Sequence, residues 1–324
     1  MIRQRAILYN NIRMFFAERQ VLEVETPILS GACVPDVNIE PIYTDKYYLQ
    51  TSPELAMKRL LVAGSGAIFQ ITKAFRDGEI GHWHNPEFSI LEWYRPGFKA
   101  ADLINEIDEL LQLLLKTPAA ERISYCTIFK QYTGLDALHC PIADLEQYCA
   151  KLGFKAKTER DTYLQFIFSH QIETQLNKPT VITDFPATQA ALARKRTDNP
   201  ELAERFEFYV QGIELANGFY ELTDPIEQRQ RFEQDLAKRQ KLNLATHPID
   251  EDFLAALEVG LPECSGVALG LDRLLMLIMG VSDIKQVLSF PINQTVRFPK
   301  PDRSLDLIIS YKPDLSGFQN LTGL

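Results

Sequence analysis

The sequence predicts an α+β fold in which a mostly antiparallel sheet is flanked by helices and a helical insertion interrupts the chain. Strand-like runs at 67–75 and 87–94 are joined by a polar loop, so they lack the βαβ spacing of parallel strands. The runs at 1–20 and 101–115 carry apolar residues at three- and four-residue steps, which indicates amphipathic helices. With 324 residues, 46% of them hydrophobic, the chain can bury a large core without a disulfide or a metal.

Local signals mark the remaining elements in order. Pro27 ends an apolar/acidic strand that starts near residue 21, and Pro53 is placed to open a helix that runs to about Val62. Asp102 is a plausible cap for the helix at 101–115. The other expected elements are a short strand at 47–50, strands at 180–186 and 205–216, a charged helix at 225–241, and a strand at 264–270 that passes into a helix at 271–279.

The stretch 117–178 breaks into short helical pieces, and we interpret it as a helical insertion packed on the main domain. The breaks fall at Pro118, Gly134, Pro141 and Gly153. The main domain, with this insertion, is expected to span 1–290. Residues 291–324 contain prolines and few helical signals, so we expect a C-terminal tail and assign it no role.

The composition limits which binding partners and which cellular location are expected for this protein. Acidic residues outnumber basic ones by 43 to 34, a formal net charge of −9, whereas nucleic-acid-binding proteins are usually basic, which argues against tRNA as a partner. The five cysteines are scattered without a C-x-x-C pair, which favours reduced thiols. The first residues lack the apolar core of a signal peptide, and no apolar run approaches about 18 residues. We therefore expect a cytoplasmic protein that does not associate with a membrane.

A cluster of hydrogen-bond donors with one aromatic residue follows the strand-like run at 67–75. Arg76 offers a planar guanidinium that suits phosphate oxygens. His84 and Asn85 add donors, and Phe88 adds an aromatic face for a base. These are the groups that an ATP site needs. Taken alone, the pattern fits a charged hairpin loop with an aromatic core residue at least as well.

Two carboxylates, Glu214 and Glu221, stand seven residues apart with Asn217 and Gly218 between them. On two adjacent strands joined by a turn, they could converge on Mg²⁺. This ion binds with ATP to one or two carboxylates plus phosphate oxygens. The alternative is a solvated hairpin edge.

Two shorter motifs are weaker signals. Gly266 to Arg273 reads GVALGLDR, in which small residues let a backbone approach a ligand before Arg273 begins a helix. The run from Thr51 to Glu54 reads TSPE and puts a carboxylate at a helix start. Helix capping is the simpler account of Ser52 and Glu54.

Taken in order, these motifs resemble a known family. The strings VETP, TSPE, FR…HNPEF…EWY, ELANGF.EL and GLDR are similar to the three signature motifs of class II aminoacyl-tRNA synthetases, and HNPEF and E-x-x-NGF-x-EL resemble the lysyl-tRNA synthetase subgroup. The runs MKRLLVAG, NPEFSILEWYRP, RFE..Y..GIELANGF.ELTD and CSGVALG bring the chain closer still to the elongation factor P lysine ligases, which are paralogues of lysyl-tRNA synthetase. The resemblance extends from the first residues to about Phe290.

The resemblance implies a role for each matching residue and implies ATP and Mg²⁺ as cofactors. ATP would be bound by Arg76, Asp77, Gly78, His84, Asn85, Phe88, Glu214, Leu215, Gly270 and Arg273, with Arg76 and Arg273 as the catalytic residues. The amino acid would be bound by Ser52, Pro53, Glu54, Tyr94, Glu221 and Ala268, and Mg²⁺ by Glu214 and Glu221.

The chain departs from the family pattern at three places. Gly78 stands where a glutamate is usual, so either Glu79 replaces that glutamate through a shifted loop or one adenine contact is lost. Lysyl-tRNA synthetases have an anticodon-binding domain before the first helix, and here that helix starts the chain. Ala268 and its neighbour Val267 stand where those enzymes are richer in glycine, which would reshape the amino-acid pocket and fits a preference for β-lysine.

We therefore expect an ATP-dependent ligase that activates (R)-β-lysine or lysine as an aminoacyl-adenylate and transfers it to a lysine side chain of elongation factor P. Two alternatives stay open: a minimal lysyl-tRNA synthetase that charges tRNA, and a non-catalytic regulatory paralogue. Because motif 1 of class II synthetases forms a dimer interface, we also expect a homodimer with Pro27 near the contact.

Overall fold

The structure, a computed structural model, describes residues 1–292. Met1–Pro291 form one compact unit. The tail expected at 291–324 lies outside the described residues except for Pro291 and Ile292. Within the part of the chain that the structure describes, no helix combines the length and apolar character needed to span a bilayer.

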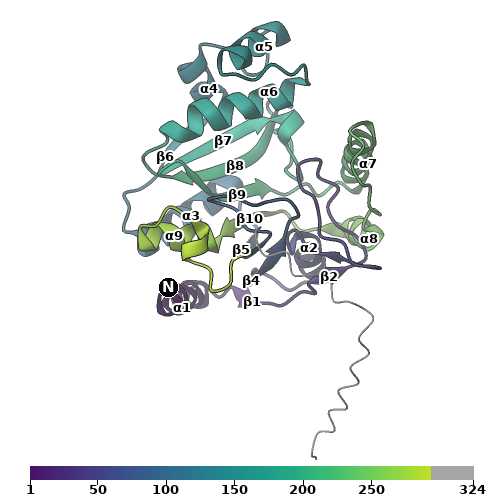
Figure 1. Ribbon diagram of the computed structural model, residues 1–324. Helices are drawn as coiled ribbons and strands as arrows, with labels where there is room; N and C mark the ends of the chain where they lie inside the picture. Colours follow the sequence, from purple (N-terminus) through teal and green to yellow (C-terminus); the bar gives the residue numbers. More distant parts are fainter. Residues whose placement is uncertain (293–324) are drawn as a thin grey trace, which may run out of the picture. The chain divides into compact units, whose positions relative to one another are not determined.

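One large sheet organises this unit and confirms the predicted mostly antiparallel α+β fold (Figure 1). From one edge to the other, its strands are β1 (Leu22–Glu23), β4 (Ile68–Phe75), β5 (Glu87–Pro96), β10 (Cys264–Gly270), β9 (Ile213–Tyr220), β8 (Leu202–Val210), β7 (Thr180–Pro186) and β6 (Glu121–Ser124). The pairs from β4 to β7 are antiparallel, and the outermost pairs, β1 with β4 and β6 with β7, are parallel.

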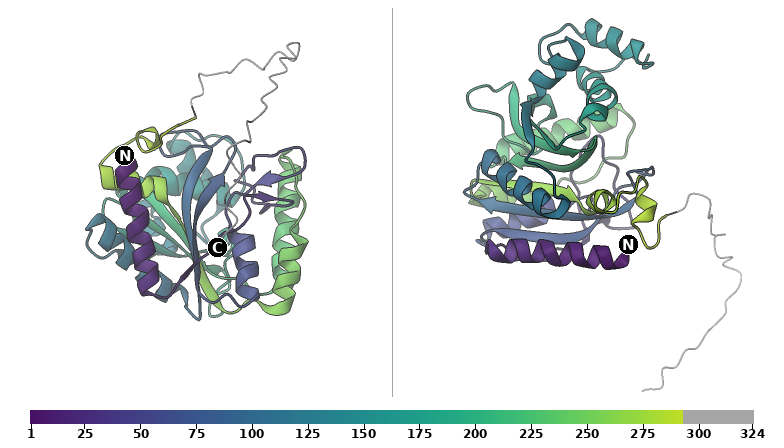
Figure 2. Two further views of the ribbon diagram at one scale, coloured as in Figure 1. Left: turned by 90° about the horizontal axis from the view of Figure 1, so that it is seen from below. Right: turned by 90° about the vertical axis from the view of Figure 1, so that its left-hand side faces the viewer.

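Three helices pack on one face of the sheet, on the left in Figure 1 and beside the N-terminus in Figure 2. They are α1 (Ile2–Glu18), α3 (Ala100–Leu115) and α9 (Leu271–Met279). Their apolar stripes form the main core with the sheet, where the ring of Phe16 stacks on Phe69 at 4.5 Å and meets Trp93 at 5.4 Å. Helices therefore cover this face of the sheet, so a functional site is expected on the opposite face.

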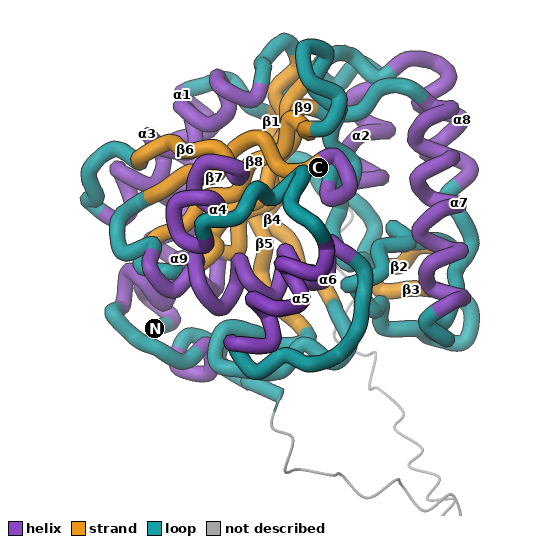
Figure 3. The backbone as a smooth tube through the Cα atoms, turned by 90° about the horizontal axis from the view of Figure 1, so that it is seen from above, coloured by secondary structure: helices purple, strands orange, loops and turns teal. Residues whose placement is uncertain are grey.

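Two separate groups of helices cover parts of the opposite face. Figure 3 shows α7 (Pro225–Lys241) and α8 (Glu251–Gly260) side by side, next to the small hairpin of β2 (Leu29–Ser30) and β3 (Tyr48–Leu49). With α2 (Glu54–Val62) they enclose a second core. The helices α4 (Tyr125–Thr133), α5 (Ile142–Lys151) and α6 (Arg160–Ile167) form a third core against β7 and β8. Short helical turns lie at Phe168–Ile172, Glu173–Gln175, Ala187–Gln189 and Ile284–Gln286.

The structure corrects three sequence-based expectations. The run 205–216 is not one strand, because β8 and β9 meet in a hairpin whose turn residues Gln211 and Gly212 have φ values of 53° and 73°. Two-residue turns of this kind need positive φ at both positions. The stretch 117–178 is largely helical, but it also contributes β6 to the main sheet. Asp102 is the third helical residue of α3 and bonds back to the Lys99 amide at 3.0 Å, so it supports the cap from inside the helix.

Candidate active site

Residues of three neighbouring strands, β5, β10 and β9, lie side by side in the middle of the sheet, on the face away from α1. Ala268 of β10 lies opposite Glu92 of β5 on one side and Asn217 of β9 on the other. Residues directly opposite each other on neighbouring strands point to the same face. Side chains that are distant in the sequence are thus brought onto one surface.

A bulge in β9 places Glu214 on this same face. Phe208 pairs with Ala216, but the next residue, Tyr209, pairs with Glu214, so β9 has one residue more than β8 at this point. In a regular strand Glu214 and Asn217, three residues apart, would point to opposite faces. The extra residue reverses the alternation and turns the Glu214 carboxylate towards the site.

One cavity gathers many of the predicted nucleotide-binding residues. It is lined by Ile39, Arg76, Glu79, Trp83, His84, Asn85, Phe88, Ser89, Ile90, Glu214, Leu215, Ala216, Asn217, Ala268, Gly270, Asp272, Arg273 and Ile284. Asp77 and Gly78 are exposed in the loop and do not line it. Seven of the residues expected to bind ATP besides Arg76 therefore face one space: His84, Asn85, Phe88, Glu214, Leu215, Gly270 and Arg273.

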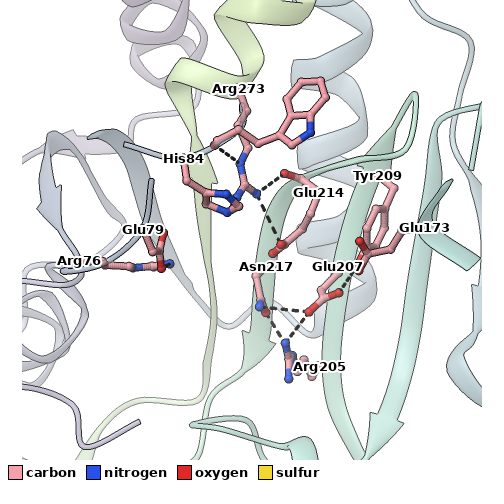
Figure 4. A network of polar contacts seen from close by, with 11 residues as sticks. Arg76, Glu79, His84, Glu173, Arg205, Glu207, Tyr209, Glu214, Asn217 and Arg273 are labelled. Atoms are coloured by element: carbon pink, nitrogen blue, oxygen red, sulfur yellow. Dashed lines mark hydrogen bonds and ion pairs between the residues drawn. The ribbon is translucent and has the colours of Figure 1, made fainter. Parts of the chain in front are cut away.

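Arg273 lines this cavity, where its guanidinium also lies 3.5 Å from the Glu214 carboxylate (Figure 4). Its guanidinium donates to the backbone oxygen of Glu214 at 2.8 Å and to Nε2 of His84 at 2.7 Å. Burial, together with the charge of Arg273, lowers the pKa of His84. Because arginine can only donate, Nε2 of the neutral imidazole accepts, and Nδ1 carries the proton. His84 thus keeps one donor for a ligand.

Arg76 is prepared to bind an anion. Its guanidinium lies 5.0 Å from the centre of the Phe88 ring and 3.6 Å from the Glu79 carboxylate, and its Nε is buried without a hydrogen-bond partner. A buried donor without a partner is costly unless a ligand completes it. Gly78 has a φ of +73°, which allows the turn that brings Glu79 back into the wall of the cavity. Of the two alternatives for Gly78, this geometry favours a shifted loop with Glu79.

The structure does not bring together the two carboxylates predicted to share Mg²⁺. Glu214 is the second residue of β9 and Glu221 directly follows the end of that strand, so the two are not on two strands joined by a turn. Seven residues of strand span about 23 Å. Glu221 instead forms an ion pair with Lys58 at 2.6 Å. The geometry expected for this pair, two adjacent strands joined by a turn, is therefore wrong.

Glu207 of β8 is the carboxylate that sequence reasoning missed. It lies seven residues before Glu214 and faces Asn217, and its carboxylate accepts from the hydroxyl of Tyr209 and from Arg205 (Figure 4). Burial raises the pKa of Glu207, with the Arg205 charge opposing the shift and the charge of Glu214 adding to it, so these two carboxylates interact. The described residues hold no group of three or more His, Cys, Asp or Glu suited to a metal ion. A pair of carboxylates completed by phosphate oxygens is nevertheless the donor set that Mg²⁺ uses with ATP.

A second group of charged side chains, which we call the acidic pocket, is a largely buried cluster of Glu54, Glu92 and Glu221 around Lys58. The side chain of Lys58 is fully buried, and its Nζ lies 2.6 Å from Glu54 and 2.6 Å from Glu221. Ser52 donates to Glu92 at 2.8 Å, and the hydroxyl of Tyr94 donates to Glu92 at 2.6 Å. Pro53 precedes α2, which carries Glu54 and Lys58 on one face.

The charges in the acidic pocket are unbalanced. Burial raises the pKa of Glu221 to about 8 against the opposing charge of Lys58. Burial, aided by the charge of Glu54, raises the pKa of Glu92 to about 7. Burial disfavours the charged form of Lys58, but the charges of Glu221 and Glu54 outweigh this and raise its pKa. One cation for these carboxylates leaves a net negative site that suits a ligand with ammonium groups.

Most of the amino-acid sequence matches a known family. The family model described as tRNA synthetases class II (D, K and N) covers residues 1–294. The chain belongs to this family.

Relatives of this class II synthetase chain include bacterial proteins named elongation factor P–(R)-β-lysine ligase. The protein of Haemophilus influenzae strain PittGG is 50% identical over 304 residues, which cover 90% of this chain and 94% of the relative. The proteins of Avibacterium paragallinarum and Vibrio vulnificus strain YJ016 are 51% and 49% identical, with 89% and 90% of this chain covered and 94% and 95% of the relatives. The resemblance drawn from the motifs is confirmed.

Proposed function

We propose that this chain activates a lysine-type diamino acid, (R)-β-lysine or lysine, with ATP and transfers the acyl group to a lysine side chain of elongation factor P. The relatives above are named as ligases of this kind, which favours protein modification over tRNA charging and over a non-catalytic role. The observation that carries the proposal is the acidic pocket on the same sheet face as the arginine-lined cavity, with Ala268 opposite Glu92 at their junction.

The two sites would bind different substrates because one is acidic and the other contains arginines. The acidic pocket would bind the ammonium groups of the amino acid, and Arg76 and Arg273 would bind the phosphates of ATP. The carboxylate of the amino acid would then attack the α-phosphorus, and pyrophosphate would leave. A carboxylate needs no general base for this attack, so positioning and charge neutralisation carry the step.

We infer that Glu214, which lines the nucleotide cavity, would hold Mg²⁺ together with phosphate oxygens, and that the charge of Glu207 on the neighbouring strand would favour the ion there. When bound, the ion would supply charge neutralisation at the phosphates. The chain's own residues would do the rest: Phe88 would present a ring to the base, and Asn85, whose Nδ2 already donates to the Glu87 oxygen at 2.6 Å, would present its side chain beside it. Arg76 would add its buried Nε as a donor.

We further propose that the protein works as a cytoplasmic homodimer. Exposed apolar side chains occur in the elements near the N-terminus, namely Ile2, Ile7 and Met14 of α1, Leu22 of β1, and Ile28 and Leu29 next to Pro27. Exposed apolar side chains that gather on one surface are typical of protein contacts. A second copy is the partner that the class II synthetase family implies for this region.

Mass spectrometry of elongation factor P tests the proposed function. The factor is incubated with this protein, ATP, Mg²⁺ and either (R)-β-lysine or lysine, and we expect one lysine side chain to gain the mass of one lysyl group. The variant Arg76→Ala should abolish the gain because it removes a phosphate ligand, whereas Arg229→Ala, which removes an exposed ion pair with Glu251, should not. If the protein charged tRNA and left elongation factor P unmodified, the proposal would be contradicted.

A further inference from the structure

The segment between β2 and β3 forms a wall of the nucleotide cavity, although residues 31–42 contain no helix or strand. Ile39 lines the cavity. The backbone oxygen of Glu40 accepts the amide of Asp77 at 2.7 Å, and the oxygen of Gln50 accepts the amide of Phe75 at 2.9 Å. Arg76 lies between these two anchored residues, and its own amide donates to the oxygen of Pro86 at 2.9 Å, so residue 40 is one of the groups that fix the backbone around Arg76.

A single buried side chain, Arg239 of α7, holds this segment. Its side chain is fully buried. Its Nη1 donates to the backbone oxygens of Asp36 at 2.7 Å and Ile39 at 3.1 Å, and its Nη2 pairs with the carboxylate of Glu40. Nε donates to the oxygen of Ala245 at 2.6 Å, which ties the guanidinium to its own end of α7.

The chemistry of this contact requires arginine. A planar guanidinium presents donors in a fixed fork and can satisfy several acceptors at once. A lysine at position 239 has a point-like ammonium and could not reach the oxygens of Asp36, Ile39 and Ala245 together with the Glu40 carboxylate. Those oxygens would lose their donors inside the protein, and the segment would no longer have one preferred position.

We propose that Arg239 is a positioning residue for ATP, which acts through residues 36–40 on the cavity wall at Ile39 and on the backbone at Asp77. The inference rests on the proposed function only in assigning the cavity to ATP. Arg239 does not line the cavity, and it lies on a helix that contributes no residue to that lining.

The test compares Arg239→Lys and Arg239→Met with the wild type and with Arg229→Ala as a matched control. Arg229 is on the same helix, and its ion pair with Glu251 is exposed. Calorimetry should show the Kd for ATP raised about tenfold or more in the Arg239 variants and unchanged in the control. In lysine-dependent pyrophosphate exchange, the KM for ATP should rise by a similar factor while the KM for lysine changes less than about twofold.

A second readout does not depend on the reaction. Hydrogen exchange at the amide of Asp77 should be faster in Arg239→Lys, because its acceptor at residue 40 is released, and unchanged in Arg229→Ala. If Arg239→Met does not fold, Arg239→Lys carries the comparison. Unaltered ATP affinity with unaltered exchange at Asp77 would overturn the inference. A wild type that binds ATP but activates no lysine would refute the proposed function while leaving this test intact.

Discussion

Lys58 is a cation buried in a pocket that we assign to a cationic substrate. Its ammonium lies 2.6 Å from Glu54 and 2.6 Å from Glu221, and Glu92 completes the acidic pocket with its own hydroxyl donors, Ser52 and Tyr94. A site with three carboxylates and one ammonium can accept two further positive charges before it becomes neutral. That charge count matches an amino acid with two ammonium groups.

The pKa values in the acidic pocket predict an acid limb for lysine activation. Burial raises the pKa of Glu221 to about 8 and that of Glu92 to about 7, and only their ionised forms attract an ammonium group. The value of kcat/KM for lysine should therefore fall as the pH drops from about 8 towards 6. Lys58→Met removes a charge that lowers both pKa values, so the midpoint should move to higher pH.

Lys178→Met is the matched control, because Lys178 is exposed and pairs with Glu121 at the surface. Its pH profile should coincide with that of the wild type. The same midpoint in Lys58→Met and the wild type would mean that Lys58 has a purely structural role. Both variants are compared by pyrophosphate exchange over the whole pH range.

The same carboxylates make the free energy of unfolding depend on pH when no amino acid is bound. A pKa that is raised in the folded state means that the folded protein keeps protons that the unfolded chain releases. Stability from Glu221 and Glu92 is thus fully present below the ordinary value of 4.5 and is lost as the pH rises through about 7 to 8. A bound diamino acid should oppose this loss.

At the scale of elements, β10 shapes the acidic pocket through one glycine. A Cβ built at Gly266 would lie 2.2 Å from a ring carbon of Tyr94 and 2.5 Å from Oε1 of Glu221. Because Gly266 has no side chain, the ring of Tyr94 and the carboxylate of Glu221 can lie close to this strand. A Cβ built at Gly270, on the same strand, would lie no closer than 3.7 Å to the side chain of Arg273, and Gly270 lines the nucleotide cavity.

Gly266→Ala should impair binding of the amino acid selectively. Overpacking costs about 1–3 kcal/mol, so the KM for lysine should rise roughly five- to 150-fold. The Kd for ATP, measured by calorimetry, should stay within about twofold, because Gly266 does not line that cavity. An equal loss for both ligands would show that the strand had shifted as a whole and would contradict this account.

At the scale of the whole molecule, the exposed apolar side chains of α1 and β1 predict self-association. Met14 and Leu22 are 54% and 57% exposed, which is unfavourable for a monomer in water. The double variant Met14→Glu/Leu22→Glu should be monomeric in light scattering, whereas the wild type should be dimeric. Val259→Glu, at an 80% exposed position of α8, should remain dimeric. A wild type that is monomeric at micromolar concentration would refute the dimer.

Much of the fold was predictable because its signals are local. The strand Cys264–Gly270 and the helices Leu271–Met279 and Pro225–Lys241 have the predicted bounds, since the period of apolar residues and the positions of proline and glycine can be read along the chain. The motifs also determined the family, since their order and spacing are properties of the sequence itself.

The tertiary structure alone decided which carboxylates are neighbours. The sequence pairs Glu214 with Glu221 by proximity along the chain, whereas the hairpin and its bulge bring Glu214 next to Glu207 and leave Glu221 with Lys58. Strand register, burial and a one-residue bulge depend on contacts between distant segments, and a pattern of residue types does not encode them locally. The sequence by itself therefore determined the family, most of the elements and about half of the residues that line the cavity, and folding determined how those residues are grouped.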